Sequence, residues 1–181
     1  MVVALSDKKG DKLGLDIRAY SGLRKNERLT DRLNKKKIHL DYEGDEFIMY
    51  PQLSYIEDAF PNRANPLKYN GDAYDYEGRI SFSISSYGTY NQFRSTLEAF
   101  ADKVESKLFD DLIDFSDCEG VIGCVLCEKL YNAFAMYEDE YERYISRLFN
   151  NEVVDDMLMC IYRKFKHAFG IGRYGGAVEF C

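Results

Sequence analysis

The sequence predicts a single α+β domain across residues 1–181, with a strand-rich N-terminal half that contains one helix and a C-terminal pair of antiparallel helices. Alternating apolar and polar residues dominate the first part of the chain, whereas helical spacing of apolar residues dominates the part after residue 120. The 181 residues, 46% of them hydrophobic, are enough for one domain with a sizeable core. We expect residues 1–12 to form a flexible N-terminal extension.

The first predicted strand covers Leu13–Tyr20 and ends at Ser21-Gly22. The next stretch, Leu23–Lys37, is strongly basic. Within it Leu29 and Leu33 stand four residues apart, a spacing that fits a short amphipathic helix as well as a solvated loop. The basic cluster could hold a phosphate-bearing ligand. Runs of charge are more often solvated surfaces, and we favour that interpretation.

Two further strands, Lys37–Tyr42 and Phe47–Tyr50, are predicted on either side of the turn Glu43-Gly44-Asp45. Pro51–Pro66 is predicted to be a loop, and Asn70-Gly71-Asp72 indicates another turn. The segment that follows the basic cluster is therefore expected to consist of short strands joined by turns and one longer loop.

A half-buried strand is predicted over Arg79–Ser85, where three apolar residues alternate with serines. A helix is expected to begin near Thr89 or Asn91, because either residue can cap it. The apolar residues of this helix recur at helical spacing, at Phe93, Leu97, Phe100, Ala101, Val104 and Leu108.

The C-terminal part is predicted to be helical from Val121 onward, with long helices over Glu128–Phe149 and Val153–Phe169. The short connection between these two helices favours an antiparallel hairpin. Ala177–Phe180 is predicted to be a last short strand at a sheet edge. The first long helix is rich in tyrosine, so it is the expected interface if the chain forms a homo-oligomer.

The charge balance limits the classes of partner. The chain has 31 acidic and 24 basic residues, a formal net charge of −7. A net charge of this sign does not attract nucleic acid or an anionic membrane surface, whereas a basic protein surface is compatible. No apolar run approaches the ~20 residues of a membrane span, and the apolar Met1–Leu5 precedes the nearby basic residues, the reverse of a signal peptide. We expect a cytoplasmic protein with no direct binding to nucleic acid or membrane.

Three cysteines, Cys118, Cys124 and Cys127, have the spacing C-x5-C-x2-C. A zinc site would need a fourth ligand, such as Cys160 or Cys181. No second C-x-x-C follows, and on a helix the last pair would share one apolar face. We therefore expect buried structural cysteines, and neither a metal nor a cofactor.

The stretch Phe115–Gly123 gathers Ser116, Asp117 and Glu119 just before apolar residues. The spacing of Ser116 and Glu119 is that of a capping box, which favours the start of a helix. The alternative is a site in which Asp117 and Glu119 hold a divalent cation or act as acid and base. With only two histidines in the chain, an enzyme is the less favoured class.

A second candidate site is the turn Ser86–Asn91, which lies between a predicted strand and a predicted helix. The first N–H groups of a helix have no partner within the helix, so an anion can bind there. Arg94 lies about one turn into the helix and could reach the same anion. Every capped helix shows part of this pattern.

Four segments together resemble a group of uncharacterised proteins from phages and prophages. They are Gly14–Tyr20, Ser86–Arg94, Phe115–Gly123 and the end of the chain, Gly176–Cys181. Members of the group carry "GLDI-AY", "SY-GYN-WR" and "FSDCEG-IG" segments in this order and finish near "GAVDFH". The order and spacing match over most of the chain.

The resemblance is weakest over Leu23–Asp75, apart from Phe60–Arg63, which is similar to an "FPGR" element. This chain also has Phe93 where the group often has Trp, and Cys181 where the group has His. That last difference argues against any scheme that needs a C-terminal histidine.

The resemblance implies a phage or mobile-element origin, a location in the host cell cytosol and, as for many small accessory phage proteins, a role against host defence. It supplies no activity. It also supplies a set of shared polar residues that are expected to converge on one pocket. These residues are Asp16, Tyr20, Ser86, Tyr87, Tyr90, Asn91, Arg94, Ser116, Asp117 and Glu119.

Three functional hypotheses follow. The first is a non-enzymatic binder of an anionic, nucleotide-like ligand, in which Arg94 meets the anion while Tyr87 and Tyr90 stack on a ring. The second is an acidic inhibitor that occupies the basic groove of a host nuclease, as some anti-CRISPR proteins do. The third is a hydrolase that uses Asp117 and Glu119.

Overall fold

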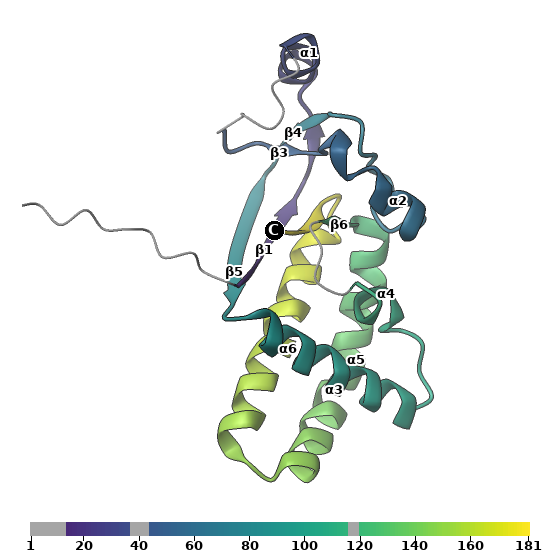
Figure 1. Ribbon diagram of the computed structural model, residues 1–181, viewed down its shortest axis with the longest axis vertical. Helices are drawn as coiled ribbons and strands as arrows, with labels where there is room; N and C mark the ends of the chain where they lie inside the picture. Colours follow the sequence, from purple (N-terminus) through teal and green to yellow (C-terminus); the bar gives the residue numbers. More distant parts are fainter. Residues whose placement is uncertain (1–13, 37–43, 116–119) are drawn as a thin grey trace, which may run out of the picture.

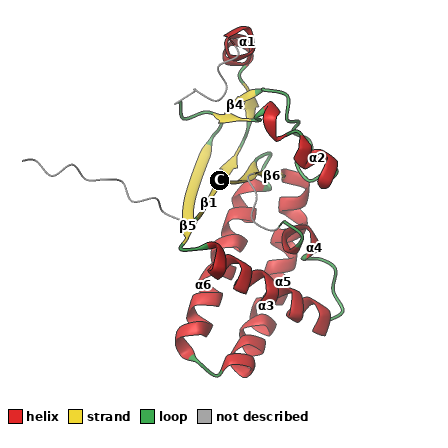
Figure 2. Cartoon of the chain, viewed as in Figure 1, coloured by secondary structure: helices red, strands yellow, loops and turns green. Residues whose placement is uncertain are grey.

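The computed structural model describes residues 14–36, 44–115 and 120–181. It confirms an α+β fold, with two antiparallel sheets in the N-terminal half and a C-terminal helix pair (Figures 1 and 2). The molecule is elongated, with a small sheet and one helix at one end and the hairpin of two long helices at the other (Figure 1). The predicted extension 1–12 and the predicted strand 37–42 lie outside the described residues.

The larger sheet, sheet A, joins strands from the start, the middle and the end of the chain. In spatial order it contains β5 (Gly78–Ile84), β1 (Leu15–Ser21), β7 (Ala177–Phe180) and β6 (Gly120–Gly123). All neighbouring strands are antiparallel. Along β1 the side chains of Leu15, Ile17 and Ala19 are buried on the face that packs against α6, as the period of two along a strand requires.

The smaller sheet, sheet B, contains β2 (Arg24–Lys25), β4 (Ala73–Asp75) and β3 (Phe47–Ile48) in that order. The helix α1 (Glu27–Lys36) packs on sheet B through Leu29 and Leu33. A short 3₁₀ turn, η1 (Pro51–Leu53), and the helix α2 (Tyr55–Ala59) follow β3. Sheet B extends beyond one end of sheet A, whereas α2 lies beside β6 (Figure 1).

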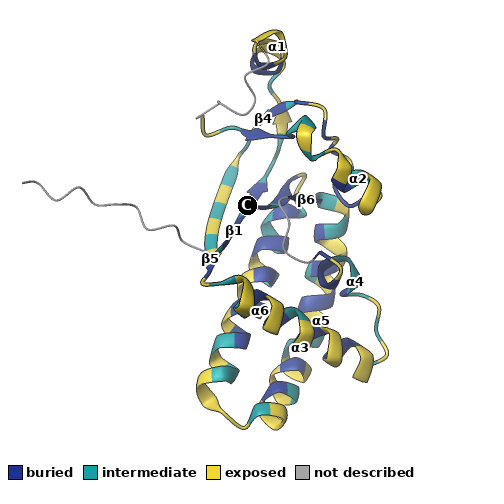
Figure 3. Ribbon diagram, viewed as in Figure 1, coloured by how far each residue is buried: buried dark blue, intermediate teal, exposed yellow. Residues whose placement is uncertain are grey.

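The helical layer consists of α3 (Tyr87–Lys103), α4 (Asp110–Ile113), α5 (Cys124–Phe149) and α6 (Glu152–Gly172). The predicted hairpin is confirmed for α5 and α6. Asn150 ends α5 in the left-handed conformation, with φ of 47°, and the Asn151 side chain caps α6 by accepting from the N–H groups of Val153 and Val154. The helix surfaces that face one another and the sheet are buried (Figure 3).

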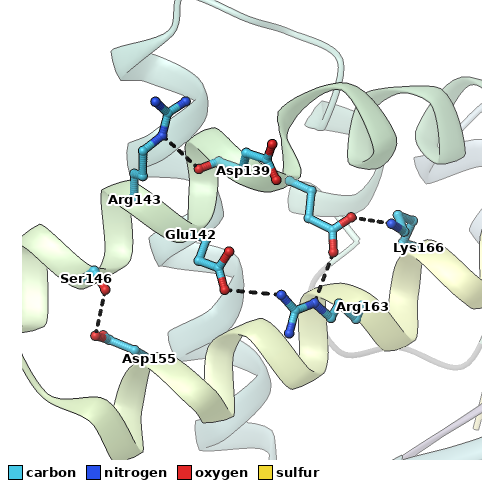
Figure 4. Close-up of polar contacts among 8 residues, drawn as sticks. Asp139, Glu142, Arg143, Ser146, Asp155, Arg163 and Lys166 are labelled. Carbon is cyan, nitrogen blue, oxygen red and sulfur yellow. Dashed lines mark hydrogen bonds and ion pairs between the residues drawn. The ribbon is translucent and has the colours of Figure 1, made fainter.

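The exposed seam between α5 and α6 is lined by ion pairs (Figure 4). Arg163 donates to Glu138 (Nε–Oε1, 3.0 Å) and to Glu142 (Nη2–Oε1, 3.1 Å), and Lys166 also binds Glu138. Hydrogen bonds from Lys166 and Arg163 lower the pKa of Glu138. Exposed pairs of this kind contribute ~0–1 kcal/mol each, so they align the helices more than they stabilise them.

Several sequence predictions are corrected. Pro51–Pro66 contains η1 and α2, so it is not simply a loop. Residues Gly120–Gly123 form β6, so the chain does not become helical at Val121. β7 lies between β1 and β6, so it is not an edge strand. Each of these elements is short, and its conformation or its place in the sheet is decided by the strands and helices it packs against.

The tyrosines of α5 pack in part within the chain. Tyr141 has no exposed surface, and its ring stacks on that of Tyr162 at a centroid distance of 4.6 Å. Tyr137 packs against Phe100 of α3. Tyr131, Tyr137 and Tyr144 keep part of their surface exposed, so the oligomer interface on this helix stays a prediction. Within the described residues, no helix is long and apolar enough to cross a membrane.

The core centres on Phe165 of α6, which joins the sheet to the helices. Its ring contacts Phe82 of β5, Phe93 of α3, and Phe180 of β7. We expect Phe165→Ala to lower the free energy of unfolding by about 3–5 kcal/mol, because it leaves a cavity at this junction.

Urea denaturation followed by circular dichroism measures this change. Met136→Ala, on the solvent side of α5 where Met136 is 68% exposed, is the control and should change the free energy by less than about 0.5 kcal/mol. A loss below about 1 kcal/mol for Phe165→Ala would contradict the central position of Phe165.

Candidate functional site

The face of sheet A that points away from α6 carries polar side chains. Because side chains alternate along β1, Arg18 and Tyr20 lie on the opposite face from the buried Ile17 and Ala19. The antiparallel register places Arg18 directly opposite Glu179 of β7. These residues come from distant parts of the sequence and meet only through strand pairing.

A cavity of about 280 Å³ opens on this polar face. Its floor is the β1–β7–β6 part of sheet A, and its other wall is the chain from β3 through η1, together with Tyr69. The lining residues are Arg18, Ile48, Tyr50, Gln52, Leu53, Tyr69, Gly120, Val121, Glu179, Phe180 and Cys181. We call this cavity the sheet pocket. It combines apolar and tyrosine walls with one cation and one carboxylate, which is the usual make-up of a small-molecule site.

Glu179 is the most constrained polar group of the sheet pocket. Its side chain is 13% exposed, it accepts a hydrogen bond from the Tyr20 hydroxyl (Oη–Oε2, 2.9 Å), and Arg18 Nη1 lies 3.6 Å from the same oxygen. Burial raises the pKa of the Glu179 carboxyl, although Tyr20 and Arg18 both oppose that rise. Burial and the neighbouring Glu179 raise the pKa of Tyr20.

The other titratable side chains of the sheet pocket apart from Arg18, those of Tyr69, Tyr50 and Cys181, are uncharged at neutral pH. Tyr69 accepts a hydrogen bond from the Val121 N–H (2.9 Å), and burial raises the pKa of its hydroxyl to about 12. Burial also raises the pKa of Tyr50. Burial, together with Glu179, raises the pKa of the Cys181 thiol to about 12. At neutral pH these groups are therefore protonated, and Cys181 is a poor nucleophile.

Two of the predicted site residues belong to this face. Tyr20 supports Glu179 from beneath. Asp16 is exposed and accepts from the hydroxyl of Ser83, and its main chain pairs with that of Cys181 (N–O distances 3.1 and 2.8 Å). Asp16 does not line the sheet pocket.

The predicted anion site at the start of α3 is filled by the chain itself. The helix begins at Tyr87, earlier than the predicted Thr89 or Asn91, and Ser86 is its cap. The Ser86 hydroxyl accepts from the Thr89 N–H (3.1 Å), so it takes the donor that an anion would use. Tyr87 is 40% exposed and lies outside the sheet pocket.

Tyr90 and Arg94 bind main-chain carbonyls. Tyr90 is fully buried and donates to the carbonyl of Phe115 (2.9 Å), so the prediction that its ring stacks on a ligand is wrong. Arg94 donates through Nε to the carbonyl of Ile113 (2.9 Å) and through Nη1 to Asn91 Oδ1 (3.1 Å). These residues hold the end of the segment 110–115 against α3.

Ser116, Asp117 and Glu119 lie outside the described residues, so their predicted roles stay predictions. The capping-box interpretation is nevertheless wrong, because the following residues form β6 and the next helix begins only at Cys124. The chain is held on either side of the stretch 116–119, at Phe115 by Tyr90 and at Val121 by Tyr69. Of the predicted residues that the structure describes, Asp16 and Tyr20 lie on β1, whereas Ser86, Tyr87, Tyr90, Asn91 and Arg94 lie at the start of α3.

The cysteines do not form a cluster in the described part of the chain. Cys127 is buried as predicted and donates to the carbonyl of Ile122 (3.3 Å), whereas Cys160 is exposed and Cys124 is half-buried. Burial raises the pKa of Cys127. Among residues 14–36, 44–115 and 120–181, no group of three or more His, Cys, Asp or Glu side chains could hold a metal ion.

Comparison with known proteins gave no relative: no family model, no curated protein and no solved structure matches this chain.

Sequence reasoning missed Arg18, Glu179, Tyr50 and Tyr69. Arg18 could have been found, because it lies between Asp16 and Tyr20 on the polar side of an alternating strand. Glu179 also interrupts an apolar strand, Ala177–Phe180. Tyr50 and Tyr69 carry no local pattern that separates them from the other tyrosines.

The first prediction for this region concerns Tyr90. Tyr90→Phe removes the donor to the buried Phe115 carbonyl, which should lower the free energy of unfolding by about 1–3 kcal/mol. Tyr87→Phe, at the 40% exposed first residue of α3, should change it by less than about 0.5 kcal/mol. Equal effects in chemical denaturation would contradict the assigned role of Tyr90.

A second prediction concerns Glu179. Its raised pKa means that the folded protein binds this proton more tightly than the unfolded chain, so the resulting stability is present at pH below the unfolded value and is lost as pH rises through the folded pKa. Glu179→Gln has no such loss. The stability of the variant relative to the natural protein should therefore increase between pH 4 and pH 8.

Thermal unfolding at several pH values measures this difference. Glu98→Gln, which removes an exposed carboxylate from α3, is the matched control. A relative stability of Glu179→Gln that falls with rising pH would show that attraction to Arg18 outweighs desolvation of the carboxylate.

Proposed function

We propose that this chain is a non-enzymatic binding protein that captures a small anionic, nucleotide-like ligand in the sheet pocket. The observation that carries the proposal is the pairing of β1 with β7, which sets Arg18 beside a largely buried Glu179 in a half-open pocket of about 280 Å³. This volume is at the lower end of the ~300–1,000 Å³ that is typical of ligand pockets.

Arg18 is the anchor for the anion. Its side chain is 39% exposed, and its Nη1 atom lies 3.6 Å from Glu179 Oε2. A guanidinium carries five N–H donors in a planar fork that matches a phosphate or carboxylate. This role replaces the one predicted for Arg94, which instead binds the carbonyl of Ile113.

The remaining walls suit a ring with polar edges. Tyr50 and Leu53 offer flat and apolar surface, and Tyr50 takes the stacking role that had been predicted for Tyr90. Glu179 can accept from ring N–H groups, and Gln52 can both donate and accept. A nucleobase or similar heterocycle with an attached anionic group satisfies all of these surfaces.

Binding is favoured over catalysis by the composition of the pocket. Glu179 is the one carboxylate among the described lining residues, and it is already hydrogen-bonded to Tyr20. General acid–base hydrolysis commonly uses two such groups, or one group with a metal. The hydrolase alternative would depend on Asp117 and Glu119, which are not among the described residues.

The role against host defence, and with it the host cytosol as location, rests on the sequence resemblance. A captured nucleotide-like ligand would fit such a role, because removing a small signalling molecule needs affinity and no turnover. The relevant property would then be slow release of the ligand.

Isothermal titration calorimetry against a panel of mononucleotides, cyclic nucleotides and dinucleotides tests the proposal. At least one member should bind, and Arg18→Gln should weaken that binding by about 10–100-fold, as expected for the loss of a charge-assisted hydrogen bond worth about 1.5–3 kcal/mol. Arg147→Gln, which removes the same charge from an exposed position on α5, is the control.

The control should bind as the natural protein does, and both variants should keep their melting temperature within a few degrees. If no panel member binds below millimolar concentration, or if Arg18→Gln binds as tightly as Arg147→Gln, the sheet pocket is not the site.

A second candidate function, an acidic inhibitor of a host nuclease, is favoured by one observation. A hollow of about 420 Å³ at the hairpin end of α5 and α6 is lined by four carboxylates and no base. They belong to Glu142, Glu152, Asp155 and Asp156. A partner held there would bind with a steep dependence on salt and would be indifferent to Arg18→Gln.

A further inference from the structure

The basic residues of this acidic chain are concentrated in one segment. Residues 24–36 contain six basic and two acidic side chains, a net charge of +4. Since the whole chain has a net charge of −7, the remaining residues together carry −11. The structure places this segment on β2 and α1, at the end of the molecule opposite the hairpin of α5 and α6 (Figure 1). Charges separated by more than ~8 Å are largely screened at physiological salt, so the net charge does not cancel this local field.

The bases of α1 form a line along one exposed face. Arg28, Arg32 and Lys35 are spaced i, i+4 and i+7, so they share one side of the helix and their Cα atoms rise by about 6 Å and about 4.5 Å. With Lys36 and the carboxylate of Asp31 they line a hollow of about 340 Å³, so four bases and one acid face it. Within the described residues, Arg28, Lys35 and Lys36 are in no ion pair.

The opposite face of α1 is fixed to the protein. Leu29 and Leu33 are buried against sheet B, and Thr30 accepts from the N–H of Ala73 (3.0 Å). Asn26 caps the helix by accepting from the N–H of Leu29 (2.9 Å). The basic line is therefore presented on a rigid support, with its outer face exposed (Figure 3).

The composition of the exposed face of α1 distinguishes among three possible anionic partners: a membrane surface, a protein and a nucleic acid. A helix that binds a membrane surface exposes an apolar face, but both leucines of α1 are buried. A protein interface has apolar or aromatic residues at its centre, and the outer face of α1 has none. Evenly spaced arginines and lysines without apolar neighbours match the contacts that proteins make to nucleic-acid phosphates.

We propose that α1 is a docking surface for the phosphate backbone of a nucleic acid, bound without regard to sequence. This departs from the expectation based on net charge, because the charge is segregated along the molecule. The proposal is independent of the sheet pocket and does not require a ligand there.

Fluorescence anisotropy with labelled 20-nucleotide single strands and duplexes of DNA and RNA tests the proposal. About three phosphate contacts predict a slope of about −2.7 for log K against log salt on a duplex, or a loss of about 40-fold between 50 and 200 mM salt. The double variant Arg28→Gln/Lys35→Gln should weaken binding at 50 mM salt and reduce the loss over this range to less than about 10-fold.

Two matched variants control for charge and for folding. Arg143→Gln/Arg147→Gln removes the same charge from exposed positions on α5 and should bind as the natural protein does. Arg28→Lys/Lys35→Arg keeps both charges and should retain the affinity and the slope.

Absence of binding at 50 mM salt, or an equal loss in the α5 control, would overturn the proposal. Polyglutamate added at the same concentration of negative charges as the oligonucleotide should not displace it. If it does, the assignment to nucleic acid is overturned. Stronger binding to anionic phospholipid vesicles than to oligonucleotide would do the same.

Discussion

The main-chain pairing of β1 with β7 is the interaction on which the rest of the structure depends. It brings residues 17–20 to residues 177–180, and the reciprocal hydrogen bonds between Asp16 and Cys181 continue the pairing to residue 181. β7 approaches closely because Gly176 lies against the main chain of Tyr20, where a Cβ atom would be 1.8 Å from the carbonyl oxygen. Once this register is formed, one face of sheet A receives Phe165 and the helices, and the other face holds Arg18 beside Glu179.

The same pairing explains why the polar face of sheet A contains a largely buried carboxyl group, that of Glu179. Glu179 would be more easily accommodated as an exposed carboxylate or as an apolar residue, since burial raises its pKa. Tyr20 and Arg18 partly offset that cost. A buried, partly satisfied carboxylate in a pocket is typical of functional sites, where chains keep groups that reduce stability. The tyrosines around it have raised pKa values and donate or accept as neutral hydroxyls.

The fold could be predicted from the sequence where the pattern is local. The alternation of β5, the helical periodicity of α5 and α6, and the Asn150-Asn151 connection all gave the observed elements. The failures are short segments such as β6, β7 and α2, whose conformation or neighbours depend on distant residues. The prediction of the site residues failed for the same reason. Tyr90 and Arg94 look like ligand-binding residues in sequence, but their positions beside Phe115 and Ile113 make them supports for the main chain. Arg18 and Glu179 are 161 residues apart, and no local pattern links them.

The central claim is that the sheet pocket holds a small anionic molecule against Arg18 and Glu179. The most direct measurement is native mass spectrometry of the protein isolated from the cells that naturally produce it, followed by denaturation to release bound molecules. The account predicts an added mass of nucleotide size on the natural protein, absent from Arg18→Gln prepared in the same way. A protein of unmodified mass in both preparations, or one that carries a basic protein partner in place of a small molecule, would contradict it.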